Sequence, residues 1–296
     1  GVRVMTERSN DRRRALICRL AFASTLCCTL LITLSVAALL FPNPIKLYSA
    51  APAELSTLRP VELELAGVPA WHIPNRRATV QLLLVHGRSR DRRWLAPLIA
   101  LLQRDYELFA IDLPGHGAQG YGLSAFGRRA ARTIRATLEA IEARSEGKRP
   151  IVVYGTSMGG SATLMALDRW RPASLIAVIS DGSYAEIEPI VERISQWLPS
   201  PIAHLSIWLA ETIGGFQLSE IKPIKSAAQL SLPYFVLHGR ADSLIPLSHG
   251  ERLAAAAPQG KLIPYEGTHD QPSEPAKQAA LLRVLRAIEK RSLRVE

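Results

Sequence analysis

The chain has 296 residues, of which 48% are hydrophobic and 21% are charged, and its net charge is +10. This composition excludes a disordered chain and supplies one core of about 200 to 250 residues with some chain left over. Because no compact basic tract contains interleaved aromatic residues, we expect no nucleic acid partner, and the excess positive charge better suits anionic lipid headgroups.

An apolar segment near the N-terminus is the first predicted element. Residues 20–41 (LAFASTLCCTLLITLSVAALLF) carry no charge, and as a helix they would measure about 33 Å, enough to cross a bilayer. Residues 1–19 contain six arginines and two acidic residues. The positive-inside rule therefore predicts a basic cytoplasmic N-terminus, a single-pass anchor and an extracytoplasmic domain. A cleaved signal peptide is the alternative, although its apolar region usually has only about 7 to 15 residues.

The part of the chain after the apolar segment, which we expect to be exported, contains no cysteine and begins with a linker. All three cysteines (Cys18, Cys27 and Cys28) lie in or beside the apolar segment. The exported part therefore has no thiol for a disulfide or a cysteine metal site, and we expect no cofactor and no metal. A linker rich in Pro, Ala and Ser at residues 42–59 leads to one domain, residues 60–296.

From residue 61 onward, strand-like runs alternate with helical runs. Strands are expected at residues 61–65 and 68–73, paired around Ala66-Gly67, and then at 80–85, 107–111, 151–154, 175–179, 234–237 and 261–265. Helices are expected near 94–104, 124–143, 158–170, 248–257 and 274–290. This alternation predicts an α/β fold with a mostly parallel sheet covered by helices on both faces. Sites in such sheets lie at the carboxyl ends of the strands.

One serine lies at such a position. Residues 155–159 (GTSMG) follow the strand at 151–154 and open a helix, which fits the G-x-S-x-G nucleophile elbow around Ser157. The sharp turn requires glycines, because larger side chains would collide with the adjoining strand and helix. The pattern alone is a weak signal, since it also occurs as an ordinary turn.

A serine hydroxyl needs a base that removes its proton. Asp242 lies in the loop after the strand at 234–237, and His269 lies in the loop after 261–265. Both loops open on the same sheet edge as Ser157, in the order Ser, Asp, His. Asp181, after the strand at 175–179, is an alternative acid, and His249, at the start of a probable helix, is an alternative base.

Two further motifs, LLLVHG (82–87) and DLPGHG (112–117), accompany GTSMGG, HGRAD and GTHD. In this order the five motifs resemble the α/β-hydrolase superfamily over residues 60–290, especially serine esterases, monoacylglycerol lipases and related serine peptidases. The resemblance implies Ser157 as nucleophile, His269 as general base and then acid, and Asp242 as the carboxylate that orients the imidazole. It also implies an oxyanion hole formed by the backbone N–H groups of Met158 and Arg88.

Other polar residues of these motifs have structural interpretations. His86 and His116 are expected to hold loops, and Asp112 is expected to stabilise a turn. For the cluster of Arg88, Arg90, Arg92 and Arg93, a solvated surface is the default interpretation.

Residues 183–225 interrupt the alternation with two amphipathic helical patterns separated by Pro199 and Pro201. The resemblance implies a small helical cap here, which covers the nucleophile and shapes the substrate pocket. Trp197 and Trp208 lie on the two apolar faces, so we expect these faces to line an apolar pocket. The alternative is that they only seal the sheet.

The predicted function is a membrane-anchored serine hydrolase that cleaves a small-molecule carboxylic ester, with an apolar acyl group, through an acyl-enzyme. A serine peptidase or an acyltransferase would use the same triad. An aminopeptidase would also need a cap carboxylate for the substrate amine, and the cap provides Glu186, Glu188, Glu192 and Glu211. A noncatalytic membrane-tethered binding protein is the alternative from another class.

Overall fold

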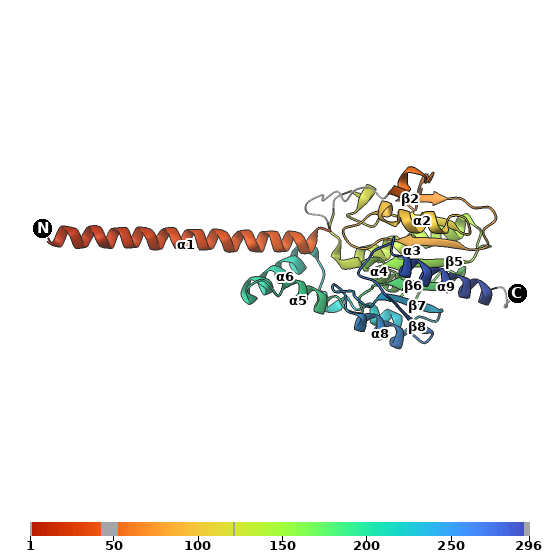
Figure 1. Cartoon of the computed structure of the whole chain (residues 1–296). Helices are drawn as coiled ribbons and strands as arrows, with labels where there is room; N and C mark the ends of the chain where they lie inside the picture. The colour runs from red at the N-terminus through yellow and green to blue at the C-terminus, as the bar shows by residue number, and fades with distance from the viewer. Residues whose placement is uncertain (1, 43–52, 121, 293–296) are drawn as a thin grey trace.

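A computed structural model describes residues 2–42, 53–120 and 122–292 of the chain. Most of the expected linker, residues 43–52, lies outside this part. Helix α1 (Val2–Leu40) projects away from the α/β domain (Figure 1). It includes residues 2–19, for which the sequence predicted only a basic terminus. Its segment Leu16–Leu40 is long and apolar enough to cross a membrane, with a mean hydropathy of 2.1.

The described residues form an eight-stranded sheet in the order β1-β2-β4-β3-β5-β6-β7-β8. Its strands are β1 (Val61–Leu65), β2 (Val68–Ile73), β3 (Gln81–Val85), β4 (Glu107–Ile111), β5 (Ile151–Thr156), β6 (Leu175–Asp181), β7 (Tyr234–Gly239) and β8 (Gly260–Tyr265). β1 and β2 form an antiparallel pair at the edge, and β2 is antiparallel to β4. All other pairs are parallel. The predicted α/β fold with a mostly parallel sheet is confirmed.

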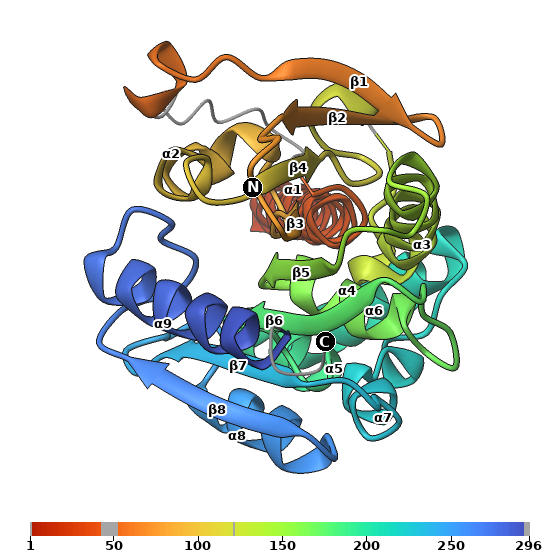
Figure 2. The same cartoon turned by 90° about the vertical axis from the view of Figure 1, so that its right-hand side faces the viewer.

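Helices cover both faces of the sheet (Figure 2). One face carries α2 (Ala96–Leu102) and α9 (Pro275–Ser292), and the other carries α3 (Arg128–Arg144), α4 (Met158–Ala166), α7 (Pro223–Ala227) and α8 (Leu247–Ala256). Because side chains alternate along a strand, Leu82 and Leu84 of β3 join the core under α2 and α9, whereas Leu83 and Val85 join the opposite core.

Two helix boundaries differ from the sequence prediction. α3 begins at Arg128 because Phe126 (φ 44°) and Gly127 (φ 89°) have left-handed backbone conformations that do not fit a helix. α4 ends at Ala166, four residues before the predicted end. Arg169 (φ 53°) also lies in the left-handed region, so the segment that connects α4 to β6 is a turn.

The expected cap segment contains α5 (Glu188–Ser195) and α6 (Ser200–Gly214), and α6 lies beside the C-terminal part of α1 (Figure 1). Trp197 and Trp208 are 68% and 58% exposed. The prediction that these indoles line a pocket over Ser157 is therefore wrong. The reason is that α6 packs on α1 through its small residues, which directs Trp208 outward.

Candidate active site

Ser157 occupies the turn between β5 and α4 in a strained conformation. Its φ and ψ angles are 52° and −124°, a region that non-glycine residues rarely adopt and that costs about 1 to 3 kcal/mol. Its N–H donates to the Asp181 carbonyl oxygen at 2.7 Å, which ties the turn to the neighbouring strand.

The two glycines of the elbow are required by close backbone contacts. A Cβ atom on Gly155 would lie 2.6 Å from the Gly160 nitrogen, and one on Gly159 would lie 2.7 Å from the Val85 carbonyl oxygen. Both distances are shorter than a van der Waals contact. The steric reason that the sequence suggested for these glycines therefore applies in the structure.

The side chains of Ser157, His269 and Asp242 form a continuous chain of hydrogen bonds. His269 Nε2 lies 3.0 Å from Ser157 Oγ, and His269 Nδ1 lies 2.7 Å from Asp242 Oδ2. The other carboxylate oxygen of Asp242 accepts the N–H groups of Leu244 and Ile245 at 3.0 and 2.8 Å. The ends of β5, β7 and β8 thus bring together a hydroxyl, an imidazole and a fixed carboxylate, which is the arrangement that activates a serine.

Asp181, the alternative acid, has other partners. Its carboxylate accepts the hydroxyls of Tyr154 and Tyr265 at 2.7 and 2.9 Å and pairs with Lys277 at 2.9 Å. Burial, and then the Asp181 charge, raise the pKa of both tyrosines well above the usual range, so both remain donors. The structure places Asp242 on the imidazole and engages Asp181 in a buried network beneath the site.

His249, the alternative base, supports the cap. Its Nδ1 accepts the Ala185 N–H at 3.2 Å. Burial is the main cause that lowers its pKa, which favours the neutral form that this bond requires.

Gly182 is a site residue that the sequence analysis missed. A Cβ atom there would lie 3.3 Å from Asp242 Oδ2 and 3.4 Å from His269 Nδ1, and its φ is 56°. A glycine at this position leaves room for the Asp242–His269 pair. The available signal was the Asp-Gly pair directly after a buried strand.

The two predicted oxyanion donors lie on either side of Ser157. Met158 begins α4, whose first N–H groups have no acceptor within the helix and carry partial positive charge. A Cβ atom on Gly87 would lie 3.0 Å from Ser157 Cβ. The backbone at Gly87 and Arg88 is therefore close to the nucleophile, as an oxyanion hole requires.

Two neutral imidazoles hold the loop of residues 87–89. His86 Nδ1 donates to the Gly87 carbonyl at 2.7 Å, and its Nε2 accepts the Leu113 N–H at 3.0 Å. His116 Nε2 accepts the Ser89 N–H at 3.2 Å. Burial lowers the pKa of His86 to about 4 and that of His116 to about 3, so both rings are neutral near pH 7 and can accept these bonds.

Three arginines of the cluster after Gly87 are partly or fully buried, contrary to the default interpretation of a solvated surface, whereas Arg93 is exposed as that interpretation expects. Arg92 is buried and pairs with Glu62 at 2.8 Å. The Arg90 guanidinium lies 3.8 Å from the centre of the Trp94 ring. Arg88 donates to backbone carbonyls at the end of α1.

Two of the four candidate cap carboxylates, Glu186 and Glu211, have partners. Glu186 pairs with Arg252 at 2.6 Å and with Lys222 at 3.7 Å, and Arg252 is the main cause that lowers its pKa. Glu211 accepts the Leu218 N–H at 2.8 Å. Glu188 lies in the first turn of α5, and Glu192 is exposed on that helix.

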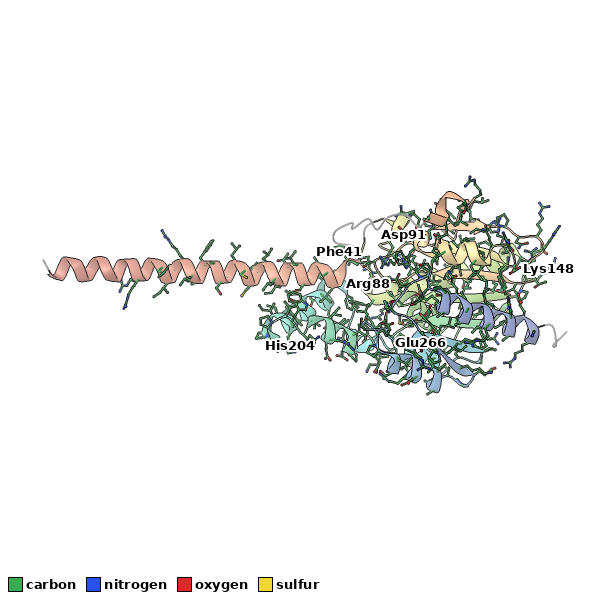
Figure 3. The ribbon with its side chains drawn as sticks, viewed as in Figure 1. Phe41, Arg88, Asp91, Lys148, His204 and Glu266 are labelled. Carbon is green, nitrogen blue, oxygen red and sulfur yellow. The ribbon has the colours of Figure 1, made fainter. Side chains whose placement is uncertain are left out.

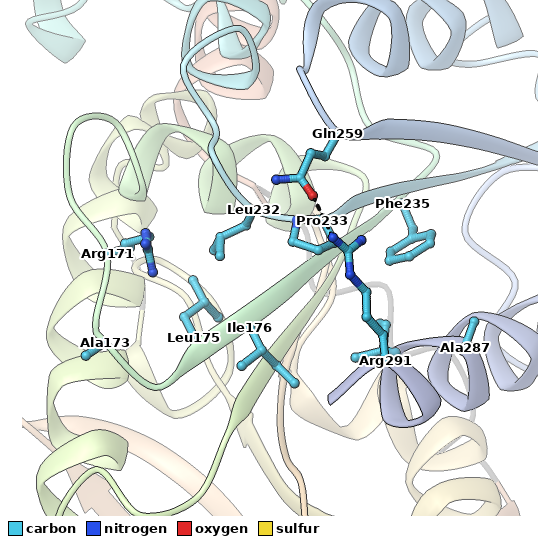
Figure 4. A pocket seen from close by; sticks show the side chains of 11 residues that line it. Arg171, Ala173, Leu175, Ile176, Leu232, Pro233, Phe235, Gln259, Ala287 and Arg291 are labelled. Atoms are coloured by element: carbon cyan, nitrogen blue, oxygen red, sulfur yellow. Dashed lines mark hydrogen bonds between the residues drawn. The ribbon is translucent and has the colours of Figure 1, made fainter. Parts of the chain in front are cut away.

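A hollow of about 450 Å³ lies at the opposite edge of the sheet, where β6 and β7 begin (Figure 4). Leu175, Phe235 and Arg291 contribute to its lining. Its described lining includes no Ser, His or Asp, so it has no nucleophile. Among the described residues, no group of three or more His, Cys, Asp or Glu side chains is arranged to hold a metal ion.

Comparisons with known proteins agree with the α/β fold. Residues 82–288 match the alpha/beta hydrolase family. The uncharacterized protein YfhR of Escherichia coli is 26% identical over 234 residues, which cover 77% of this chain and 75% of YfhR. The pimeloyl-[acyl-carrier protein] methyl ester esterase of Neisseria meningitidis is 26% identical over 159 residues, 52% of this chain and 54% of that protein.

An esterase of Pyrococcus furiosus has a similar fold. Its crystal structure superposes with a TM-score of 0.65 at 18% identity and covers 85% of this chain and 98% of the esterase. At this identity the similarity concerns the fold.

Proposed function

The chain belongs to the alpha/beta hydrolase family, and from this we propose that it is a membrane-anchored serine hydrolase that cleaves carboxylic esters through an acyl-enzyme on Ser157. The observation that carries the proposal is the hydrogen-bonded chain from Asp242 through His269 to Ser157. The methyl ester esterase among the relatives supports an ester as the substrate class.

In the acylation step, His269 Nε2 takes the hydroxyl proton while Ser157 Oγ attacks the ester carbonyl carbon. The backbone N–H groups of Met158 and Arg88 stabilise the oxyanion, and Asp242 stabilises the imidazolium. The carbonyl–alkoxide bond then breaks, His269 protonates the alkoxide, and the alcohol leaves. Water, deprotonated by His269, attacks the acyl-enzyme and releases the acid and free Ser157.

The alternative activities have less support. An aminopeptidase needs a free carboxylate for the substrate amine; Glu186 and Glu211 are already bound, which leaves Glu188 and Glu192 on α5 as the candidates for that role. An acyltransferase would pass the acyl group to an alcohol in place of water, which product analysis distinguishes. A noncatalytic binding protein has no use for the strained backbone at Ser157.

We place the enzyme on the membrane through α1, with the arginine-rich N-terminal side in the cytoplasm and the hydrolase domain outside. The contacts at the end of α1 support a retained anchor over a cleaved signal. Leu39 and Leu40 are buried against the domain, and Arg88 bonds the last carbonyls of the helix. A signal peptide that is removed has no need of such contacts.

The test is active-site labelling with a fluorophosphonate, followed by turnover of a panel of esters and peptides. Ser157→Ala should abolish labelling and lower kcat by roughly 10⁴-fold or more, because the nucleophile is lost. Ser219→Ala, at an exposed serine outside the site, is the matched control and should keep both signals. Equal turnover in the two purified variants would refute the assignment of Ser157.

A further inference from the structure

Helix α6 packs along the C-terminal half of α1. On α1 the partly or fully buried positions from Cys28 onward fall mainly three or four residues apart, and they are Cys28, Leu31, Ile32, Ser35, Val36, Ala37, Leu39 and Leu40. On α6 the buried positions are Ser206, Ala210 and Gly214, four residues apart. A Cβ atom on Gly214 would lie 3.0 Å from Leu40 Cδ2. Small residues at this spacing let two helices approach closely, as they do between helices inside membranes.

The length of α1 determines where α6 lies. From Cys28 to Leu40 the helix rises by about 18 Å, and the hydrocarbon layer of a bilayer is about 30 Å thick. If α6 lay outside this layer, only about 18 Å of the Leu16–Leu40 segment would remain to cross it. That length is too short. An α1 that spans the membrane therefore places most of α6 within the hydrocarbon.

The composition of the cap suits such an environment. Residues 194–210 (ISQWLPSPIAHLSIWLA) carry no Asp, Glu, Lys or Arg. Large apolar side chains are exposed on this segment and at the end of α6, namely Ile194, Trp197, Leu205, Trp208 and Ile213. Figure 3 shows His204 on the part of the cap that extends past Phe41 alongside α1.

Two polar side chains of α6, Thr212 and His204, have partners within the helix, whereas the buried Ser206 hydroxyl has no hydrogen-bond partner among the described residues. The Thr212 hydroxyl donates to the Trp208 carbonyl at 2.8 Å, and His204 Nδ1 lies 3.3 Å from Ser200 Oγ. Internal hydrogen bonds lower the cost of placing these groups in hydrocarbon.

A hollow lined by arginines lies at the base of the hairpin that α5 and α6 form. Arg128, Arg129 and Arg132 line a hollow of about 380 Å³ together with Gly214 and Phe216, at the end of α6 beside Leu40. The arginines occupy the first turns of α3, where the helix dipole disfavours positive charge. Arg128 pairs with Glu220 at 3.1 Å, which leaves the positive charge of Arg129 and Arg132. Phosphate groups of lipids would compensate this charge at the level where α1 leaves the hydrocarbon.

We propose that the tip of the α5–α6 hairpin, residues 194–210, is inserted into the leaflet on the side of the hydrolase domain, with α6 packed on α1 and with Arg129 and Arg132 against lipid phosphates at the base of the hairpin. The inference rests on the proposed membrane span of α1 and is independent of the chemistry at Ser157. In this arrangement the exposed apolar side chains of the cap contact the acyl chains of the bilayer. The arrangement also turns the Ser157 side of the domain toward the membrane, because Arg88, which follows Gly87 beside Ser157, donates to the last carbonyls of α1.

The test uses the five native tryptophans of the full chain as depth probes. The protein is reconstituted into phosphatidylcholine vesicles with a minor share of phosphatidylglycerol, brominated at mid-chain, and compared with unbrominated vesicles. Bromine should quench a large part of the emission of the unmodified protein. Trp197→Phe/Trp208→Phe should lose this quenching, because its remaining tryptophans lie in the domain. Trp170→Phe is the matched control and should keep it.

Each other outcome overturns the inference. The result is negative if the protein floats with the vesicles but is not quenched, or if the double variant is quenched as strongly as the unmodified protein. If the protein does not float with the vesicles, α1 does not span the membrane. This conclusion does not depend on whether the protein has esterase activity. Absence of quenching together with cross-linked dimers would show that a second copy of the chain covers the hairpin. Circular dichroism of each variant establishes that it is folded.

Discussion

The loop of residues 87–89 separates two regions that are built by different kinds of interaction. On one side lie Ser157, His269 and Asp242, held by directional hydrogen bonds of 2.7 to 3.0 Å. On the other side lie α1 and α6, held by apolar packing of small and aliphatic side chains. Directional chemistry restricts residue identity at each position, whereas apolar packing restricts mainly size and polarity. The first region is therefore visible as sequence motifs, and the second is not.

Arg88 connects the two regions. Its backbone N–H is the predicted oxyanion donor, and its guanidinium donates to the carbonyls of Ala38, Leu39 and Phe41 at 2.7, 3.1 and 3.2 Å. The last carbonyls of a helix have no intrahelical donor, so this side chain caps the end of α1. Figure 3 shows Arg88 next to Phe41 at the junction of helix and domain. Burial lowers the pKa of Arg88 to about 10, which leaves it charged at neutral pH.

The largest effect is expected from the site region, where two buried carboxylates are compared. Asp242→Asn should lower kcat by roughly 10⁴-fold with little change in KM, because the imidazole loses the carboxylate that orients it. Asp181→Asn should instead lower the free energy of unfolding by about 3 to 5 kcal/mol, because it leaves Lys277 buried without its anion. Steady-state kinetics and denaturant unfolding of both variants separate the two roles.

The opposite result would show that Asp181, and not Asp242, is the acid of the triad. In that case Asp181→Asn would be well folded and inactive, while Asp242→Asn would retain turnover. Circular dichroism establishes that both variants are folded, because a variant with an impaired triad reacts too slowly with a fluorophosphonate for active-site titration.

The site region was the more predictable of the two from sequence. Strand runs such as 107–111 and the glycines around Ser157 carry strong local constraints, and the order of the loops brought Asp242 and His269 to one edge. The sequence predicts Asp242 as the acid but keeps Asp181 as an alternative, because Tyr154 and Lys277, the tertiary partners of Asp181, have no local signature. The side chain of Arg88 and the outward direction of Trp208 depend on how α1 docks. An amphipathic pattern indicates an apolar face but not the surface that covers it.

An intermediate effect is expected at the connection itself. Arg88→Met should lower kcat by about 10- to 100-fold with KM nearly unchanged, because a loop shift of about 1 Å misplaces the oxyanion donor. Arg88→Lys should recover part of this loss, since one ammonium can still reach a helix carbonyl. Arg104→Met, at an exposed arginine outside the site, is the matched control. Unchanged kcat in Arg88→Met would mean that the anchor and the oxyanion loop are independent.

The smallest effect is expected in the membrane region, where the position of the indoles separates two models of chain-length preference. Each methylene buried in the acyl site contributes about 0.8 kcal/mol, close to a fourfold gain in binding. In the pocket model, Trp197 and Trp208 provide that burial, so Trp197→Ala/Trp208→Ala would flatten the rise of kcat/KM from acetate to hexanoate. The structure directs both indoles outward. We therefore expect the double variant to keep the slope when p-nitrophenyl esters are measured in detergent micelles.

In vesicles, the turnover of the same variant should differ from that of the unmodified protein. There the hairpin has to position the active site at the membrane surface that contains the substrate. For a long-chain ester dissolved in the bilayer, the ratio of vesicle to micelle turnover should fall about two- to fivefold, since apolar area is lost from the inserted face. Trp197→Phe/Trp208→Phe retains most of that area and should keep the ratio. A flattened dependence of kcat/KM on chain length in micelles would show that the indoles line the acyl pocket. An unchanged ratio of vesicle to micelle turnover would show that the hairpin has no role in substrate delivery. Turnover in the two media therefore distinguishes a cap that shapes the pocket from a cap that positions the enzyme in the bilayer.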